Sequence, residues 1–138
     1  ENIVGIKDSA GDIAQIIEFL RLCPPEFSVI LGNGPAFLSG LQAGAVGGIL
    51  ALANVAPREC VAIHRLLSEG RVDEARKIHF RMMPVGRAVT SQFGIAGLKA
   101  ALDILGYYGG PPRRPLLPAD DATHASIRNI LSEAGLLD

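Results

Sequence analysis

One stretch near the start of the chain decides the fold class: Asn2-Ile3-Val4-Gly5-Ile6-Lys7-Asp8-Ser9-Ala10-Gly11-Asp12. Residues 2–7 are rich in β-branched side chains and end at a charged residue, which is typical of a buried strand. The turn-forming residues that follow end at Asp12, and aspartate is a frequent helix cap. The stretch therefore predicts a strand, a loop and the start of a helix.

The same order of elements recurs twice further along the chain. Apolar residues at Ile13, Ile16, Ile17 and Leu20 share one helical face, and Pro24-Pro25 ends that helix. The predicted strands cover residues 2–7, 27–31 and 45–52. A second helix is expected to begin at Pro35, which suits a first helical position, and to end at Gly44; the later helices are expected at 57–68, 72–83, 95–105 and 121–134.

Strands that alternate with helices imply a parallel sheet with right-handed crossovers, which is covered by helices and buried on both faces. The rest of the chain is helical, with expected breaks at Gly70, Pro84 and Gly94. Residues 106–118 are rich in glycine and proline and predict an extended connector. We therefore expect an α/β region over residues 1–70 and a helical region over 71–138.

Composition excludes several classes of function. Among 138 residues, 13 are basic and 14 acidic, so the charge of -1 gives no basic field for nucleic acid. The longest apolar run, residues 44–56, is shorter than a membrane span. Cys23 and Cys60 lack metal-ligand spacing and are expected to be reduced, buried thiols of an intracellular protein of the cytoplasm or mitochondrial matrix. The abrupt start of a strand at residue 3 suggests a fragment.

Lys7 ends the first predicted strand on the same face as Ile3 and Gly5. Ligand chemistry in parallel α/β proteins lies at the carboxyl ends of strands, and an amine withdrawn from water there is available to attack a carbonyl. The alternative is a lysine that leaves the strand for solvent. Spacing alone leaves both interpretations open.

Glycines follow the other two strands. Gly32-Asn33-Gly34 fails the dinucleotide fingerprint, because Phe37 stands where its third glycine belongs. These residues predict either a small-anion site made of backbone N–H groups or an ordinary tight turn. Gly47-Gly48 has the same ambiguity, between close approach of a ligand and close packing of a helix.

The remaining polar residues suggest no second site. His64, His79 and His124 lie far apart in predicted helices, so we expect no metal site and assign them to the surface or to interfaces. Arg113-Arg114 could bind an acid, although a solvated pair in the connector is the simpler interpretation.

Residues 2–12 closely resemble the lysine strand of the dihydrodipicolinate synthase and N-acetylneuraminate lyase superfamily. Residues 44–49 with 53–57 resemble its eighth strand and the start of the following helix. Residues 93–99, 106–111 and 114–116 are most similar to 4-hydroxy-2-oxoglutarate aldolases. Together these segments cover nearly the whole chain.

The resemblance implies strands six to eight of a TIM (β/α)8 barrel, followed by a C-terminal helical extension. It implies that Lys7 forms an imine with pyruvate or a related 2-keto acid, without a metal or organic cofactor. It places Ser9, Gly32, Asn33, Gly48 and Ile49 in the substrate pocket. It also implies a homotetramer that needs the N-terminal half of the barrel, where the family's proton-shuttle tyrosine and carboxylate-binding loop lie.

Three functions remain open after the resemblance. The first is an aldolase that cleaves 4-hydroxy-2-oxoglutarate or a sugar acid. The second is a synthase that condenses pyruvate with aspartate semialdehyde. The third is a non-catalytic relative that binds a keto acid. Tyr107 and Tyr108 match the helical extension, so the resemblance does not make them the proton shuttle, and the chain by itself is expected to be inactive.

Overall fold

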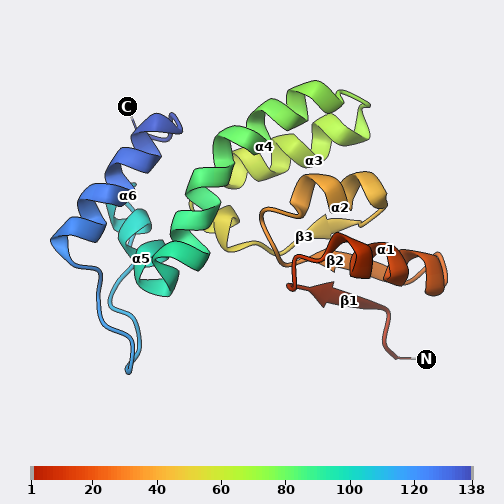
Figure 1. Ribbon diagram of the computed structural model, residues 1–138, viewed down its shortest axis with the longest axis horizontal. Coiled ribbons are helices and arrows are strands. Elements are labelled where there is room, and N and C mark those ends of the chain that lie inside the picture. The colour runs from red at the N-terminus through yellow and green to blue at the C-terminus, as the bar shows by residue number, and fades with distance from the viewer. Residues whose placement is uncertain (1, 138) are drawn as a thin grey trace.

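The computed structural model describes residues 2–137 as three strands that alternate with helices, followed by a succession of further helices (Figure 1). The strands are β1 (Gly5–Asp8), β2 (Ser28–Leu31) and β3 (Gly47–Gly48). The α-helices are α1 (Ile13–Leu22), α2 (Phe37–Ala43), α3 (Pro57–Ser68), α4 (Val72–Arg87), α5 (Gly94–Ile104) and α6 (Asp121–Glu133). A 3-10 turn, η1, covers Ala51–Asn54, and a π-turn, η2, covers Ala88–Gln92.

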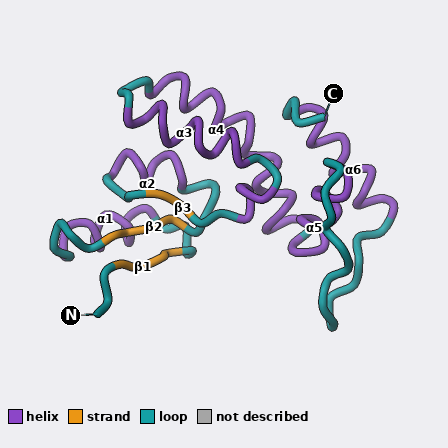
Figure 2. Tube along the Cα trace, turned by 180° about the vertical axis from the view of Figure 1, so that it is seen from behind, coloured by secondary structure: helices purple, strands orange, loops and turns teal. Residues whose placement is uncertain are grey.

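The sheet has the order β1-β2-β3 with all pairs parallel, as the alternation of elements predicted. Lys7 pairs with Ile30, and Ile30 pairs with Gly47, so these three residues share one face. Figure 2 shows the sheet at the end of the molecule that holds the N-terminus, with α5 and α6 at the opposite end.

Two of the predicted strands are too long. β1 begins at Gly5 rather than at residue 2, although the carbonyl of Val4 still accepts a hydrogen bond from the Ser28 N–H at 2.9 Å. The third strand was expected over residues 45–52, but only Gly47–Gly48 is a strand. The chain turns into η1 at Ala51, so the last part of this apolar run is a turn and not a strand. An apolar run by itself does not distinguish the two.

Asp12 caps α1 as expected, because its carboxylate accepts hydrogen bonds from the N–H groups of Ala14 and Gln15 at 2.9 and 3.4 Å. We expect Asp12→Ala to lower the free energy of unfolding by about 1 kcal/mol, since two N–H groups lose their acceptor. Urea denaturation measures this loss. Asp12→Asn keeps an acceptor and should lose less, so equal stability of both variants would contradict the capping role.

Helix α2 begins later than predicted. Pro35 lies in a turn and the helix starts at Phe37, because the Asn33 side chain accepts a hydrogen bond from the Ala36 N–H at 3.1 Å and closes the turn before the helix. The predicted end at Gly44 is confirmed: this residue has φ 119°, in the left-handed region that favours glycine.

Helix α4 continues through Pro84, where a break was predicted. Ala75, Met82 and Val85 are fully buried along one face, on both sides of the proline, and this packing holds the helix together. Proline removes only its own N–H, and its carbonyl still accepts from the N–H of Ala88. The helix instead changes character after Arg87, in the π-turn η2.

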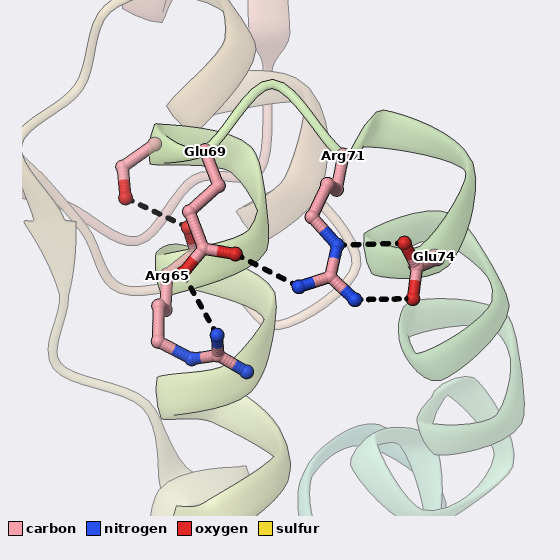
Figure 3. A network of polar contacts seen from close by, with 5 residues as sticks. Arg65, Glu69, Arg71 and Glu74 are labelled. Carbon is pink, nitrogen blue, oxygen red and sulfur yellow. Dashed lines mark hydrogen bonds and ion pairs between the residues drawn. The ribbon is translucent and has the colours of Figure 1, made fainter.

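The turn between α3 and α4 is surrounded by a chain of ion pairs (Figure 3). Arg65 contacts Glu69 at 2.8 Å, Glu69 contacts Arg71 at 3.0 Å, and Arg71 contacts Glu74 at 2.7 Å. Hydrogen bonds from Arg71 and then Arg65 lower the pKa of Glu69. All four side chains are exposed, so water and salt screen the network, and it orients the turn more than it stabilises the fold.

A single apolar core runs from the sheet into the helical region. Its largest fully buried side chains come from both parts of the chain: Ile16, Val29, Leu31, Ile63, Met82, Val85, Ile127 and Leu131. No helix among the described residues is long and apolar enough to cross a bilayer.

The two cysteines are both free, as expected, but they differ in burial. Cys60 is buried, and this burial, followed by the charge of Glu59, raises the pKa of its thiol to about 11. Cys23 lies just beyond the end of α1 and is only half-buried, so the prediction of burial is wrong for this residue.

The connector after α5 has no helix or strand, as predicted, and projects from the helices as a long loop (Figure 1). Its start is attached to α5: the Lys99 ammonium donates to the Gly109 carbonyl at 2.6 Å, and the Gly109 N–H donates to Asp103 at 2.8 Å. Tyr107 and Tyr108 are exposed there.

Candidate active site at the carboxyl ends of the strands

Lys7 lies at the carboxyl end of β1, next to the corresponding ends of β2 and β3, because the three strands are parallel. Its side chain is exposed on the face of the sheet that α1 and α2 do not cover. The sequence suggested that the Lys7 amine is withdrawn from water. This prediction is wrong for the described residues, since none of their elements lies over this face. The position at the strand end is as expected.

Gly32 brings Lys7 and Ser9 together. A Cβ atom placed on Gly32 would lie 2.7 Å from Cε of Lys7 and 2.0 Å from Oγ of Ser9, so both side chains occupy the space above this glycine. The Gly32 N–H also donates to the Asp8 carbonyl at 2.6 Å, which joins the end of β1 to the end of β2. The missing side chain at residue 32 is what allows the lysine and the hydroxyl to approach each other.

Asp8 holds the loop that contains Ser9. Its side chain is 7% exposed and points to the helix side of the sheet, opposite to Lys7. Its carboxylate accepts hydrogen bonds from the Ala10 N–H at 3.0 Å and from the side-chain amide of Gln15 in α1. A buried carboxylate with two donors fixes the loop backbone, and thereby the place of Ser9.

A cavity of about 350 Å³ opens beside Ser9 and Gly32, the two residues next to the Lys7 side chain. The ends of the first two strands line it with Ser9, Gly32, Asn33, Gly34 and Pro35. Ala51 and Leu52 of η1 add apolar surface. The structure therefore brings Lys7, Ser9, Gly32 and Asn33 of the predicted site together.

Gly48 and Ile49 are placed differently. A Cβ atom on Gly48 would lie 2.8 Å from the Phe37 ring, so Gly48 faces α2, where it lines a separate hollow with Cys60 and His64. Close helix packing, one of the two explanations that its sequence left open, accounts for this glycine. Ile49 is 58% exposed, and alternation along the strand places it on the Lys7 face.

Part of the cavity wall comes from the helical region, which the sequence interpretation missed. Gly86, Thr90 and Ser91, from the end of α4 and from η2, line it opposite the loops of the sheet region. Contacts between η1 and η2 bring these segments together. The sequence gives one signal for this role. Residues 86–91 include small and hydroxyl-bearing residues, which interrupt a helix whose other residues are apolar or charged.

His79 of α4 supports the same loop from behind. It is 6% exposed and hydrogen-bonds to the backbone of Pro35, so its assignment to the surface or to an interface is wrong. His64 is exposed, and its ring nitrogen lies 3.2 Å from the Val46 carbonyl. In residues 2–137, no three His, Cys, Asp or Glu side chains are grouped closely enough to hold a metal ion.

Burial of His79 lowers its pKa, and the bond to Pro35 opposes this shift only in part. The unfolded chain therefore binds a proton at this residue more readily, and the stabilisation is lost as pH falls from about 6.5 toward the folded value. We expect the melting temperature to fall more between pH 7.5 and 5.5 in the parent protein than in His79→Asn. His64→Asn is the matched control and should behave as the parent; identical slopes for all three proteins would contradict the prediction.

Comparison with known proteins places this arrangement in a family. The sequence matches the dihydrodipicolinate synthetase family over residues 1–134. The 4-hydroxy-tetrahydrodipicolinate synthase of Methanopyrus kandleri is 34% identical over 136 residues, which are 99% of this chain and 45% of that protein. The protein of the same name from Methanospirillum hungatei is 36% identical over 132 residues, 95% of this chain and 45% of its own length.

Solved structures agree with the sequence comparison. Dihydrodipicolinate synthase from Thermotoga maritima matches with a TM-score of 0.88 at 33% identity, over 99% of this chain and 47% of that one. The 4-hydroxy-tetrahydrodipicolinate synthase from Methylacidiphilum fumariolicum SolV matches with a TM-score of 0.89 at 31% identity, over 97% and 45%. The chain thus spans about half the length of the relatives it matches. It belongs to the dihydrodipicolinate synthetase family and forms the C-terminal part of its TIM barrel together with the helical C-terminal region.

Proposed function

We propose that Lys7 is the imine-forming lysine of a class I aldolase or lyase that acts on pyruvate or a pyruvate-derived 2-keto acid. The observation that supports this most is the place of Lys7, at a strand end with its Cε above Gly32 and beside the Ser9 hydroxyl. An amine at the carboxyl end of a barrel strand is positioned to meet a bound carbonyl.

The proposed reaction uses Lys7 as an electrophile-capturing amine. Its nitrogen attacks C2 of the keto acid and water leaves, which gives a protonated imine. In the cleavage direction the C3–C4 bond breaks, its electron pair moves toward the imine nitrogen, and the C4 hydroxyl gives up its proton as the aldehyde departs. The resulting enamine takes a proton at C3, and water then hydrolyses the imine and restores the Lys7 amine.

For the substrate we propose 4-hydroxy-2-oxoglutarate or a close analogue. Support comes from residues 93–99 and 106–111, which resemble that branch of the superfamily. The names of the relatives at 34% and 36% identity favour a second candidate, the condensation of pyruvate with aspartate semialdehyde. Ser9, Gly32, Asn33 and Ile49 are proposed to line the substrate site, and Gly48 to contribute by its backbone alone.

We also propose that the N-terminal half of the barrel completes this site. Within the described residues β1 and β3 each leave one edge unpaired, and closed barrels remove such edges. Assembly into a homotetramer is part of the same proposal, although one structural relative, 31% identical to this chain, is a monomeric dihydrodipicolinate synthase variant.

The proposal is tested by trapping the imine in a protein that contains both halves of the barrel. Incubation with pyruvate and sodium borohydride should attach a reduced pyruvoyl group to the peptide that contains Lys7, detected by mass spectrometry. An unmodified Lys7 in the folded protein would refute it. Rates of 4-hydroxy-2-oxoglutarate cleavage and of condensation with aspartate semialdehyde, measured on the same sample, decide between the two substrates.

A further inference from the structure

We infer that the hydroxyl groups of Thr90 and Ser91, on the π-turn η2, recognise the hydroxyl-bearing distal part of the substrate. This inference rests on the proposed imine at Lys7. It assigns to the helical region a part in choosing the substrate, in addition to its part in packing against the barrel.

The first support is the cavity that both regions share. Ser9 and Gly32, which contact or adjoin Lys7, line the same space of about 350 Å³ as Thr90 and Ser91. Because Cε of Lys7 lies close to Gly32 on the cavity wall, we expect a keto acid bound through C2 to the Lys7 nitrogen to extend its carbons beyond C3 into this space. Gly86 lies on the same wall and leaves room there, since a Cβ atom on it would meet only a Leu52 methyl group at 3.9 Å.

The second support is the local backbone. Helix α4 changes into the π-turn η2 where it reaches the cavity, and the N–H of Phe93 bonds to the carbonyl of Ala88, five residues earlier. The added residue in this turn lets Ala88 and Val89 remain buried while Thr90 and Ser91 are exposed at the cavity. Turns of this kind inside helices are frequent at functional sites.

The third support is the chemistry of the lining. The polar side chains that line the cavity are Ser9, Asn33, Thr90 and Ser91, all of them neutral groups that donate or accept hydrogen bonds. The Thr90 hydroxyl donates to the Gly86 carbonyl at 2.6 Å, so its oxygen is oriented to accept a bond from a ligand. Such a set is suited to an alcohol, which both donates and accepts, so the ligand class is a 2-keto acid with a hydroxyl group near C4.

The test compares Ser91→Ala and Thr90→Val with the parent protein, in a protein that contains both halves of the barrel. The probes are 4-hydroxy-2-oxoglutarate, 2-oxoglutarate, which has the same length without the hydroxyl, and pyruvate. We expect the KM for the hydroxylated acid, measured from its cleavage, to rise about three- to tenfold in each variant, as expected when one hydrogen bond is lost. Binding of 2-oxoglutarate and trapping of pyruvate at Lys7 should not change.

Ser126→Ala is the matched control, because the Ser126 hydroxyl bonds to its own helix at Ala122, in α6. It should bind all three acids as the parent does. An unchanged KM for the hydroxylated acid in both variants, or an equal loss of affinity for 2-oxoglutarate, would overturn the inference while trapping at Lys7 persists. Failure to trap pyruvate in the parent protein would overturn the proposed imine, and this inference with it.

Discussion

Replacing Lys7 with alanine is expected to abolish covalent trapping of pyruvate and to lower the turnover rate on the order of 10³-fold or more, because the amine that forms the proposed imine is lost. The fold should remain intact. Lys7 is exposed and is not part of the apolar core of residues 2–137, so the melting temperature should stay close to that of the parent. Trapping, turnover and melting temperature are to be measured on one preparation of a protein that contains both halves of the barrel.

Lys77→Ala is the matched control for this experiment. Lys77 is also an exposed lysine, but it lies on α4 away from the strand ends. The Lys77→Ala variant should trap pyruvate and turn over substrate as the parent does. Trapping that survives in Lys7→Ala would show that another amine captures the keto acid.

Gly32→Ala is expected to lower kcat/KM about 10²-fold through misplacement of the reacting groups. The new methyl group would lie 2.7 Å from Cε of Lys7 and 2.0 Å from Oγ of Ser9, and both must move. Gly32 has no positive φ, so alanine is compatible with its backbone. The displaced atoms are ends of side chains, and for this reason the loss should appear in kcat/KM and in the rate of imine trapping more than in stability.

Gly40→Ala is the comparison variant, in which the new methyl group meets the core instead of the proposed site at a similar interatomic distance. Its methyl group would lie 2.5 Å from a Leu31 methyl group in the fully buried core, away from the Lys7 face. Overpacking of this kind costs about 1–3 kcal/mol of stability. If Gly32→Ala loses stability as Gly40→Ala does while it keeps the parent rate of trapping, Gly32 is a packing residue and its assignment to the site is wrong.

Local sequence predicted most of the elements because each has its own signal. The apolar face of α1, the cap at Asp12 and the end at Gly44 appeared where the patterns placed them. Errors arose where neighbours outweigh local preference. Pro84 ends a helix in isolation, yet α4 continues through it because buried residues on both sides hold the helix together.

The site was predictable only as far as it follows the strands. The family resemblance placed Lys7, Ser9 and Gly32 in one pocket, and parallel strands, whose carboxyl ends meet at one edge of the sheet, explain why they lie close together. Gly48 was harder to place, because the sequence does not show whether the space beside a glycine is filled by a ligand or by a neighbouring side chain. Here the Phe37 ring fills this space on the helix side of the sheet.

By itself, the sequence determined the alternation of strands and helices, the place of Lys7 at a strand end and the resemblance to a Schiff-base family. These are properties of short segments, set by side-chain periodicity and by the order of residue types. Only the tertiary structure decided that Thr90 and Ser91 share a cavity with Ser9, and that His79 is buried against Pro35. Such contacts join residues more than forty positions apart in the chain, and their formation depends on how α4 packs against the sheet region, which no local pattern encodes.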